Sequence, residues 1–335
     1  LPYKKQLQYK QQEAEQLLKR IGKVELPKIL PIIGSDDTIY YRNKLEFTFS
    51  NRRYLTNEEI NKSEQIPQEN ALGYHAPGIF DKIIDIKECW LMDDINNIIR
   101  NTIRAYAVEN GLSYYDIKEH KGFFRNIILR YCTTGELMVN LVFGVDDKEE
   151  IKKISDHLLE KIPSITTLLY TINPKWNDSI YDLDPQVYSG KGYITEMLGE
   201  FKFKISPKSF FQTNTKQAEK LYTVAKDFAG LTGSETVYDL YCGTGSIGIF
   251  LSNQSTKIIG VDVIEESIKD AKENAVLNNI EHAHFFAGDV IEICNEEFVA
   301  ENGKQDVVIT DPQRAGLNVM LLAKLLDIVS HKLVY

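Results

Sequence analysis

The chain contains few cysteines and no long apolar run. Its 335 residues include only four cysteines, which are widely separated and form no C-x-x-C pair: Cys89, Cys132, Cys242 and Cys294. No window approaches the roughly 18 uninterrupted apolar residues of a membrane helix, and the first residues lack the apolar stretch and small-residue cleavage site of a signal peptide. These absences argue against a disulfide scaffold and a membrane protein. They predict a cytoplasmic protein with free thiols and no membrane partner.

Excess positive charge is also lacking. The formal net charge is −9, which argues against nucleic-acid binding over the whole surface, because neutralisation of phosphates supplies most non-specific affinity. Basic residues do cluster locally, within residues 42–53, 118–130 and 202–208. Charge alone favours the interpretation of each cluster as a solvated face.

The length of the chain and a change of pattern along it predict two domains. Strong helix formers over residues 7–21 predict an opening helix, which Pro27 and Pro31 end. Alternating apolar residues predict a half-buried strand at residues 41–49. Similar patterns predict a hairpin of residues 126–131 with 136–143, a helix at residues 147–161 and a strand at residues 168–172. Residues 36–204 are therefore expected to form an α+β domain.

From residue 205 to residue 335 helical and strand patterns alternate. Helices are predicted at residues 215–228, 246–251, 265–278 and 319–329. Strands are predicted at residues 236–240, 257–261, 283–287 and 306–310, with the start of another at 332–335. This alternation predicts an α/β fold with a doubly wound, mostly parallel sheet.

A glycine-rich turn follows the first of these strands. Gly243, Gly245 and Gly248 form a literal G-x-G-x-x-G, which fits a dinucleotide site and a methyltransferase loop equally well. Asp262 lies about twenty positions further on, where an acid holds ribose hydroxyls in both classes. The glycines therefore leave both NAD and S-adenosylmethionine open as the ligand.

Acids outside the glycines favour S-adenosylmethionine over NAD. Asp239 ends the first strand, where methyltransferases of this fold keep an acid, and Asp289 ends the third, where such enzymes contact the adenine amino group. Asp311, in an Asp-Pro turn, follows the fourth strand. Each acid alone is also typical of a helix N-cap, but four strand ends in register with a glycine turn favour a binding site.

Further motifs lie over nearly the whole chain. They are Tyr41-Arg-Asn-Lys-Leu-Glu-Phe-Thr-Phe-Ser50, Leu72-Gly-Tyr-His75, residues 83–90, Ile205-Ser-Pro-Lys-Ser-Phe-Phe-Gln-Thr-Asn214, Asp239-Leu-Tyr-Cys-Gly-Thr-Gly245, Asn274-Ala-Val-Leu-Asn278 and Asp311-Pro-Gln-Arg-Ala-Gly-Leu317. Together they resemble the RNA uracil-5 methyltransferase family, within it the bacterial 23S ribosomal RNA 5-methyluridine branch that carries an iron–sulfur cluster. The resemblance implies a Rossmann-like class I methyltransferase domain at residues 205–335. It also implies a central α+β RNA-binding domain at 36–204, and an N-terminal helix at 1–35 that packs on the catalytic domain.

The resemblance also assigns the pocket. It implies that the cofactor and uracil are bound by Gln212, Tyr241, Gly243, Gly245, Asp262, Asp289 and Asp311. Arg314 is expected to fix Asp311 or to stabilise the oxyanion that develops on the uracil carbonyl. The arginine disfavours amine chemistry, for which an aromatic residue stands at that position. Two residues depart from the family, Gln313 in place of Pro and Asp262 in place of Glu, which alters geometry rather than chemistry.

The family mechanism needs a cysteine thiolate that adds to C6 of a flipped-out uracil, because C5 alone is a poor nucleophile. The resemblance places this cysteine and a glutamate base beyond Tyr335, so the fragment itself is expected to be inactive. None of the four cysteines of the chain has a matching context. The expected function is methyl transfer to C5 of a uridine in 23S ribosomal RNA. The alternatives are a transfer-RNA uracil-5 methyltransferase and a non-catalytic RNA-binding relative.

One cysteine does have a counterpart in the family. Cys89, in Ile86-Lys-Glu-Cys-Trp-Leu91, matches the fourth ligand of a [4Fe-4S] cluster, whose other three cysteines and an RNA-binding barrel would precede Leu1. Without the resemblance, Cys89 is a buried structural thiol, since one cysteine cannot hold a cluster. We expect a monomer with ribosomal RNA as its partner.

Overall fold

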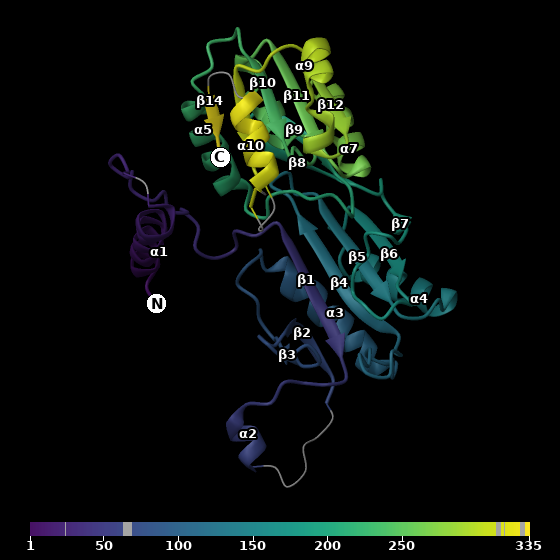
Figure 1. Ribbon diagram of the computed structural model, residues 1–335. Coiled ribbons are helices and arrows are strands. Elements are labelled where there is room, and N and C mark those ends of the chain that lie inside the picture. The colour runs from purple at the N-terminus through teal and green to yellow at the C-terminus, as the bar shows by residue number, and fades with distance from the viewer. Residues whose placement is uncertain (24, 63–68, 313–315, 318, 329–331) are drawn as a thin grey trace.

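A computed structural model describes residues 1–335 except 24, 63–68, 313–315, 318 and 329–331. Its lower half in Figure 1 is a seven-stranded sheet with the strand order β3-β2-β1-β4-β5-β6-β7. The strands are β1 Lys44–Ser50, β2 Ala71–His75, β3 Ile83–Asp85, β4 Phe124–Tyr131, β5 Leu137–Phe143, β6 Thr167–Ile172 and β7 Gln186–Ser189. The predicted hairpin is β4 with β5, which pair antiparallel. A short helix, α2 Asn57–Lys62, lies between β1 and β2.

Alternation along β1 explains how this sheet is covered. Leu45, Phe47 and Phe49 are buried, and they share a core with two helices, α3 (Ile95–Glu109) and α4 (Lys148–Lys161). The α4 helix starts where the sequence predicted, because the Asp147 side chain accepts a hydrogen bond from the Glu150 N–H at 3.0 Å. One face of the sheet is therefore covered by these helices. The residues that alternate with Leu45, Phe47 and Phe49 along β1 point to the other face.

The upper half is a parallel, five-stranded sheet in the order β12-β11-β10-β13-β14. Its strands are β10 Thr236–Leu240, β11 Lys257–Asp262, β12 Ala283–Ala287, β13 Val307–Thr310 and β14 Lys332–Val334. The helices are α5 Thr215–Ala229, α6 Ser246–Leu251, η2 Ser252–Gln254, α7 Glu265–Leu277, α8 Val290–Ile293, α9 Glu296–Asn302 and α10 Val319–Ile328. Each described element predicted in this part of the sequence is present within two residues of its expected bounds.

Both faces of the parallel sheet are buried. Val237 and Ile258 belong to one apolar cluster, which includes side chains of α5, α6 and α7. Their neighbours Tyr238 and Ile259 belong to a second cluster, which includes side chains of α8 and α10. Successive residues of a strand point to opposite faces, so the two clusters confirm the predicted doubly wound architecture.

A separate hairpin, β8 (Ile194–Leu198) with β9 (Phe201–Ile205), joins the two halves. Its apolar residues lie in the core of α5, α6 and α7. The side chain of Asn278, the C-cap of α7, holds β9 in place, because its Oδ1 accepts from the Lys202 N–H at 2.8 Å and its Nδ2 donates to the Lys202 carbonyl at 2.7 Å. The division into domains at residues 35 and 204 stays a prediction.

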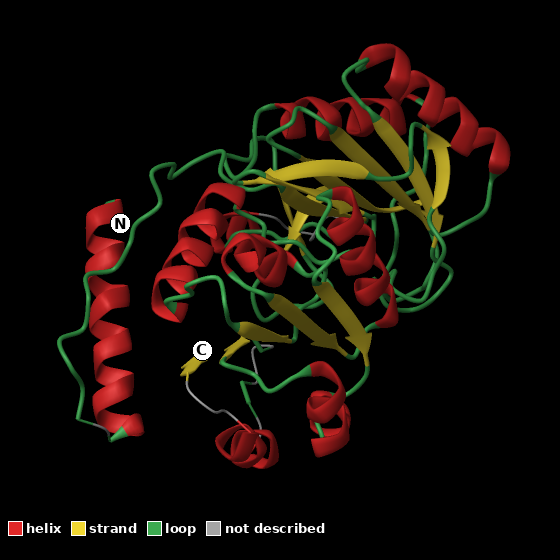
Figure 2. Ribbon diagram, turned by 90° about the horizontal axis from the view of Figure 1, so that it is seen from above, coloured by secondary structure: helices red, strands yellow, loops and turns green. Residues whose placement is uncertain are grey.

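The opening helix, α1 (Tyr3–Leu17), continues into a π-helical turn, η1 (Leu18–Gly22). It buries no residue and stands beside the rest of the chain in Figures 1 and 2. The segment that follows folds back along it, because the Ser35 N–H donates to the Tyr3 hydroxyl at 2.6 Å and the Ile32 N–H donates to Gln11 Oε1 at 2.7 Å. Within the described part of the chain, no helix has both the length and the apolar character that crossing a membrane requires.

Candidate functional site

Four parallel strands end at one edge of the five-stranded sheet, and each is followed by a residue that the sequence singled out. Tyr241 follows β10, Asp262 ends β11, Asp289 follows β12 and Asp311 follows β13. The strand order reverses beside β10, since β11 and β12 lie on one side of it and β13 and β14 on the other. Ligands of open parallel sheets bind at such a switch point, so the structure brings the predicted strand-end residues to the expected place.

The turn after β10 is held in an unusual backbone conformation. Tyr241, Gly243 and Gly245 all have positive φ, of 63°, 53° and 75°. A Cβ on Gly245 would stand 2.8 Å from the ring of Phe285, whereas a Cβ on Gly243 would meet nothing within 4 Å. Gly245 is therefore required by packing, and the space over Gly243 leaves its backbone open to a ligand.

Asp239 is fully buried beneath this turn. Its Oδ2 accepts from the Gly248 N–H in the first turn of α6 at 2.8 Å, and its Oδ1 has no partner among the described residues. Burial raises the pKa of Asp239 to about 7, with smaller contributions from the charges of Asp311 and Asp262 against the lowering effect of the Gly248 bond. The cost of keeping this carboxylate ionised would fall if a positively charged ligand lay nearby.

Asp262 fastens the glycine turn to the next helix. Its Oδ2 accepts from the Gly243 N–H at 3.0 Å, and its Oδ1 accepts from the Ile264 N–H, just before α7, at 2.9 Å. A carboxylate oxygen has two lone pairs, so both oxygens retain capacity for ligand hydroxyl groups. Asp262 thus shapes the turn before α7 without capping the helix, whose N-cap is Ile264, and it remains able to bind a ligand.

Asp289 also caps a helix. Its Oδ1 accepts from the Ile291 N–H in α8 at 2.7 Å, and the residue is exposed. Asp311 is exposed as well, and partial desolvation still raises its pKa. The predicted roles of Gln313 and Arg314 lie outside the described residues.

The Ser-Phe-Phe-Gln segment before α5 is tied to three other parts of the chain. Arg130 of β4 donates to the Ser209 carbonyl, and the Ser209 hydroxyl donates to Asp270 of α7. Asn43 Nδ2 donates to the Gln212 carbonyl at 2.9 Å. Within the segment Phe210 remains 64% exposed. The segment is therefore fixed by buried bonds while it presents an aromatic ring to solvent.

Two residues that the sequence did not single out connect Gln212 to the glycine turn. The Tyr222 hydroxyl lies 2.9 Å from Ser246 Oγ at the start of α6. Burial raises the pKa of Tyr222 to about 12, opposed by its hydrogen bonds with Ser246 and Gln212. Tyr222 is buried on the inward face of α5, and only the fold brings it to this site.

The four cysteines are all reduced and buried. Burial raises the thiol pKa of Cys132 and Cys242 well above the ordinary value, which disfavours both as thiolate nucleophiles. Cys89 Sγ lies 3.5 Å from the Tyr74 hydroxyl. Over the described ranges, no group of three or more His, Cys, Asp and Glu side chains is arranged to hold a metal ion. The cluster role of Cys89 stays a prediction.

Comparison with known proteins agrees with this geometry. A family model described as a methyltransferase domain matches residues 231–330. A relative from Bacteroides thetaiotaomicron, named an uncharacterized RNA methyltransferase, is 47% identical over 338 residues, covering 100% of this chain and 74% of the relative. A relative of the same name from Porphyromonas gingivalis is 44% identical over 340 residues, covering 100% and 73%.

A solved structure of a tRNA methyltransferase matches along nearly the whole chain. The Pyrococcus abyssi tRNA (uracil-54, C5)-methyltransferase, crystallised with S-adenosyl-L-homocysteine, superposes with a TM-score of 0.74 and 26% identity, covering 98% of this chain and 72% of that one. The fold is thus that of an S-adenosylmethionine-dependent methyltransferase. Because relatives close to half identical align along the full chain, the chain belongs to the RNA methyltransferase family.

Proposed function

We propose that this protein is an RNA uracil-5 methyltransferase that takes its methyl group from S-adenosylmethionine. The observation that carries the proposal is the assembly of Gln212, Tyr222 and Ser246 beside the glycine turn, at an edge that also collects four acids. The Ser-Phe-Phe-Gln and Asp-Pro-x-Arg-Ala-Gly motifs support uracil as the base, as does the likeness to the Pyrococcus enzyme.

The charge of the site supports S-adenosylmethionine over NAD. Asp239, Asp262, Asp289 and Asp311 come from four neighbouring strand ends, and such a group favours a ligand with a sulfonium and an ammonium over one with a pyrophosphate. In the proposed arrangement Asp262 accepts from the ribose hydroxyls and Asp289 from the adenine amino group. Tyr241, Gly243 and Gly245 lie along the methionine part, where Gly243 leaves room for close approach.

The bound S-adenosylmethionine supplies an electrophilic methyl group. In the proposed reaction a cysteine thiolate adds to C6 of the uracil, and the electron pair of the C5–C6 double bond moves onto C5 and the C4 carbonyl oxygen. C5 then forms a bond to that methyl group while the bond between the methyl group and the sulfonium sulfur breaks, and S-adenosylhomocysteine leaves. A base takes the C5 proton, the double bond reforms and the thiolate leaves. Asp311 and Arg314 are proposed to hold the uracil and stabilise the charge on its carbonyl oxygen.

For the RNA class we propose 23S ribosomal RNA, with transfer RNA as the second candidate. The context of Cys89 favours the ribosomal branch. The likeness to a tRNA enzyme favours the second candidate. Methylation of the two RNA classes, isolated from a strain that lacks the gene, decides between them: the full-length protein should restore 5-methyluridine to one class only.

Trapping of a covalent adduct tests the reaction itself. The full-length protein, S-adenosylmethionine and RNA containing 5-fluorouridine should give a stable protein–RNA adduct, because fluorine at C5 cannot leave as a proton. An Asp262→Ala variant should form none if its cofactor binding is lost. A non-catalytic RNA-binding relative, the alternative suggested by the buried cysteines, would bind the RNA without forming an adduct.

A further inference from the structure

Three loops meet at one end of the seven-stranded sheet, and each presents an aromatic side chain. They are residues 76–82, 116–121 and 173–178, which carry Phe80, His120 and Trp176. Phe80 is 70% exposed and Trp176 is 74% exposed. Packing in a core therefore explains neither of these large rings, and exposed aromatic groups that lie close together are typical of interaction sites.

The ring of His120 is stacked on that of Trp176. The ring centroids are 4.6 Å apart and the planes are inclined by only 8°. Because Trp176 is still 74% exposed, the indole face that does not touch His120 is open to solvent. A flat aromatic surface of this kind suits a planar π ligand that stacks on it.

The Trp176 loop is fixed from beneath by Arg125, whose side chain is 1% exposed. The guanidinium lies 3.9 Å from the ring centre of Tyr115. It donates to the carbonyls of Asn173, Lys175 and Asn177 at 2.8, 2.5 and 3.0 Å, and to Asp178 Oδ1 at 2.7 Å. A loop held by four bonds to one buried side chain offers its aromatic residue in a preorganised position.

The other two loops are fixed in a similar way. Asp116 Oδ1 accepts from the N–H groups of Lys118 and Glu119 at 2.9 and 3.2 Å, which shapes the turn that carries His120. Lys118 Nζ lies 2.8 Å from Asp81 Oδ2, which ties the Phe80 loop to this turn. The three loops thus form one connected structure.

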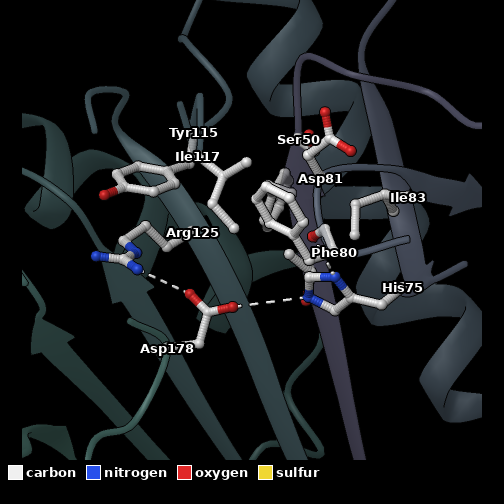
Figure 3. A pocket seen from close by; sticks show the side chains of 11 residues that line it. Ser50, His75, Phe80, Asp81, Ile83, Tyr115, Ile117, Arg125 and Asp178 are labelled. Atoms are coloured by element: carbon white, nitrogen blue, oxygen red, sulfur yellow. Dashed lines mark hydrogen bonds and ion pairs between the residues drawn. The ribbon is translucent and has the colours of Figure 1, made fainter. Parts of the chain in front are cut away.

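A small hollow of about 10 Å³, enough for roughly one water molecule, lies between the loops (Figure 3). Each loop contributes to its lining, through Phe80, Ile117 and Asp178. In Figure 3 Asp178 lies between Arg125 and His75, and its Oδ2 is 3.7 Å from His75 Nε2. The hollow is therefore too small for a base, and the groups around it fix the loops that carry the aromatic side chains.

We propose that the open face of the His120–Trp176 stack binds an unpaired nucleobase of the RNA substrate, away from the nucleotide that is methylated. The proposal rests on the proposed function, because it requires an RNA substrate. Arg130, at one end of the sheet, contacts Ser209. The opposite end of the seven-residue strand β1 lies roughly 20 Å away. RNA that spans both sites would be held several nucleotides from the target.

The sequence makes a direct measurement possible, because the chain has only two tryptophans, Trp90 and Trp176. Trp90→Phe keeps an aromatic ring on Tyr40, on which Trp90 stacks, and leaves Trp176 as the sole indole of these 335 residues, which are the chain used for the measurement. Single-stranded oligoadenylate of about ten nucleotides should quench its fluorescence in a saturable way. Double-stranded RNA of the same length should not, because its bases are already stacked.

Variants then distinguish stacking of a base on Trp176 from non-specific attraction between the protein and RNA. In the full-length protein Trp176→Ala should weaken binding of the single strand by roughly 5- to 100-fold, the range for loss of one stacked base. Trp176→Phe should retain most of the affinity, and His120→Ala should give a smaller loss. Phe228→Ala, which removes an exposed aromatic side chain from α5, is the matched control and should bind as the wild type does.

Methylation assays distinguish failure of this proposal from failure of the proposed function. In Trp176→Ala the KM for substrate RNA should rise while kcat and S-adenosylmethionine affinity stay unchanged. An active enzyme whose Trp176 is not quenched, and whose KM is indifferent to Trp176→Ala, would overturn the nucleobase site and leave the methyltransferase intact. Saturable quenching by single-stranded RNA in a protein without methyltransferase activity would support the site and count against the proposed function.

Discussion

The most deeply buried charges of the two sheets differ in sign. Around the seven-stranded sheet the charged side chains with the least exposure are Arg100, Arg125 and Arg130, at 0–3%, and all three donate to backbone carbonyls. Around the five-stranded sheet the buried charges include Asp239 and Asp262, and both accept from backbone N–H groups at the glycine turn.

This difference reflects what each region must hold in place. An arginine offers five N–H donors in a fixed plane, so a single side chain can satisfy the carbonyls of an irregular loop. A carboxylate accepts from several N–H groups, which gather at tight turns and helix N-termini. The first arrangement fixes a surface, whereas the second leaves negative charge at a site proposed to bind a cation.

The largest effect on stability is expected when a buried arginine beside the seven-stranded sheet is replaced. Arg125→Met should lower the free energy of unfolding by about 3 kcal/mol or more, because it leaves three carbonyls and the Asp178 carboxylate without their shared donor. Urea titration followed by circular dichroism measures the change.

Arg125→Lys is the matched control for charge. A lysine keeps the charge but has three donors without the planar geometry, so it should recover only part of the loss. Full recovery by lysine, or a loss below about 1 kcal/mol in Arg125→Met, would show that the Trp176 loop does not depend on the bonds described.

The next largest effect should come from the glycine turn. Gly245→Ala places a Cβ 2.8 Å from the Phe285 ring at a φ of 75°, and overpacking with backbone strain should cost roughly 2–4 kcal/mol. Gly233→Ala, where φ is 102° and nothing lies within 4 Å, isolates the strain. If both variants lose the same stability in urea titration, contact with Phe285 contributes nothing.

The buried aspartate Asp239 of the five-stranded sheet predicts that the free energy of unfolding depends on pH. The pKa of Asp239 in the folded chain is about 7, against an ordinary value of 3.8. Between these values the folded chain keeps a proton that the unfolded chain has released, so its contribution to the free energy of unfolding falls as pH rises through this window. The slope is at most about 1.4 kcal/mol per pH unit.

Asp239→Asn removes the titrating group at nearly constant shape. The difference between wild-type and variant unfolding free energies should therefore change with pH between the two pKa values and be flat above them. S-adenosylmethionine affinity of the wild type, measured by calorimetry, should increase as Asp239 ionises, because the ligand is positively charged. An affinity that is independent of pH in this range would place the cation elsewhere.

Several elements were predictable because local signals agree with the fold. β10, β12 and α6 have the bounds that the sequence predicted, since glycine or acidic residues lie at or beside the ends of these segments. The strand-end acids followed from the same rule, because the carboxyl ends of parallel strands meet at one edge.

The helix α3 was not predicted, although Ile99, Ile103 and Tyr106 have helical spacing on its inward face. Polar residues buried in its first turns obscure this pattern. Asn96, Asn97 and Arg100 are buried there, where helical periodicity calls for apolar residues. Asn96 Nδ2 donates to the Met92 carbonyl at 2.9 Å and Arg100 donates to the Lys87 carbonyl at 2.5 Å. These polar side chains support the loop before the helix, which a periodic pattern cannot reveal.

The site was also difficult to predict, because its contacts join residues that are far apart in the sequence. Tyr222 and Ser246 are 24 residues apart, and Ser209 and Asp270 are 61 apart. Nothing in the spacing of these residues indicates that they meet. Only the packing of α5, α6 and α7 on one face of the sheet brings them together.

The smallest effect on stability distinguishes the two roles of Asp289. As the N-cap of α8, its Oδ1 accepts from the Ile291 N–H at 2.7 Å. Asp289→Ala should therefore lower the free energy of unfolding by about 1 kcal/mol, whereas Asp289→Ser keeps a capping oxygen and should be nearly neutral.

Cofactor affinity then decides whether the carboxylate also binds the ligand. A serine side chain is shorter and uncharged, so Asp289→Ser should weaken S-adenosylmethionine binding roughly tenfold if the carboxylate accepts from the adenine amino group. Equal affinity of wild type and Asp289→Ser in calorimetry would make Asp289 a helix cap alone. The acids of the parallel sheet would then divide into those that only organise the turn and those that also meet the ligand.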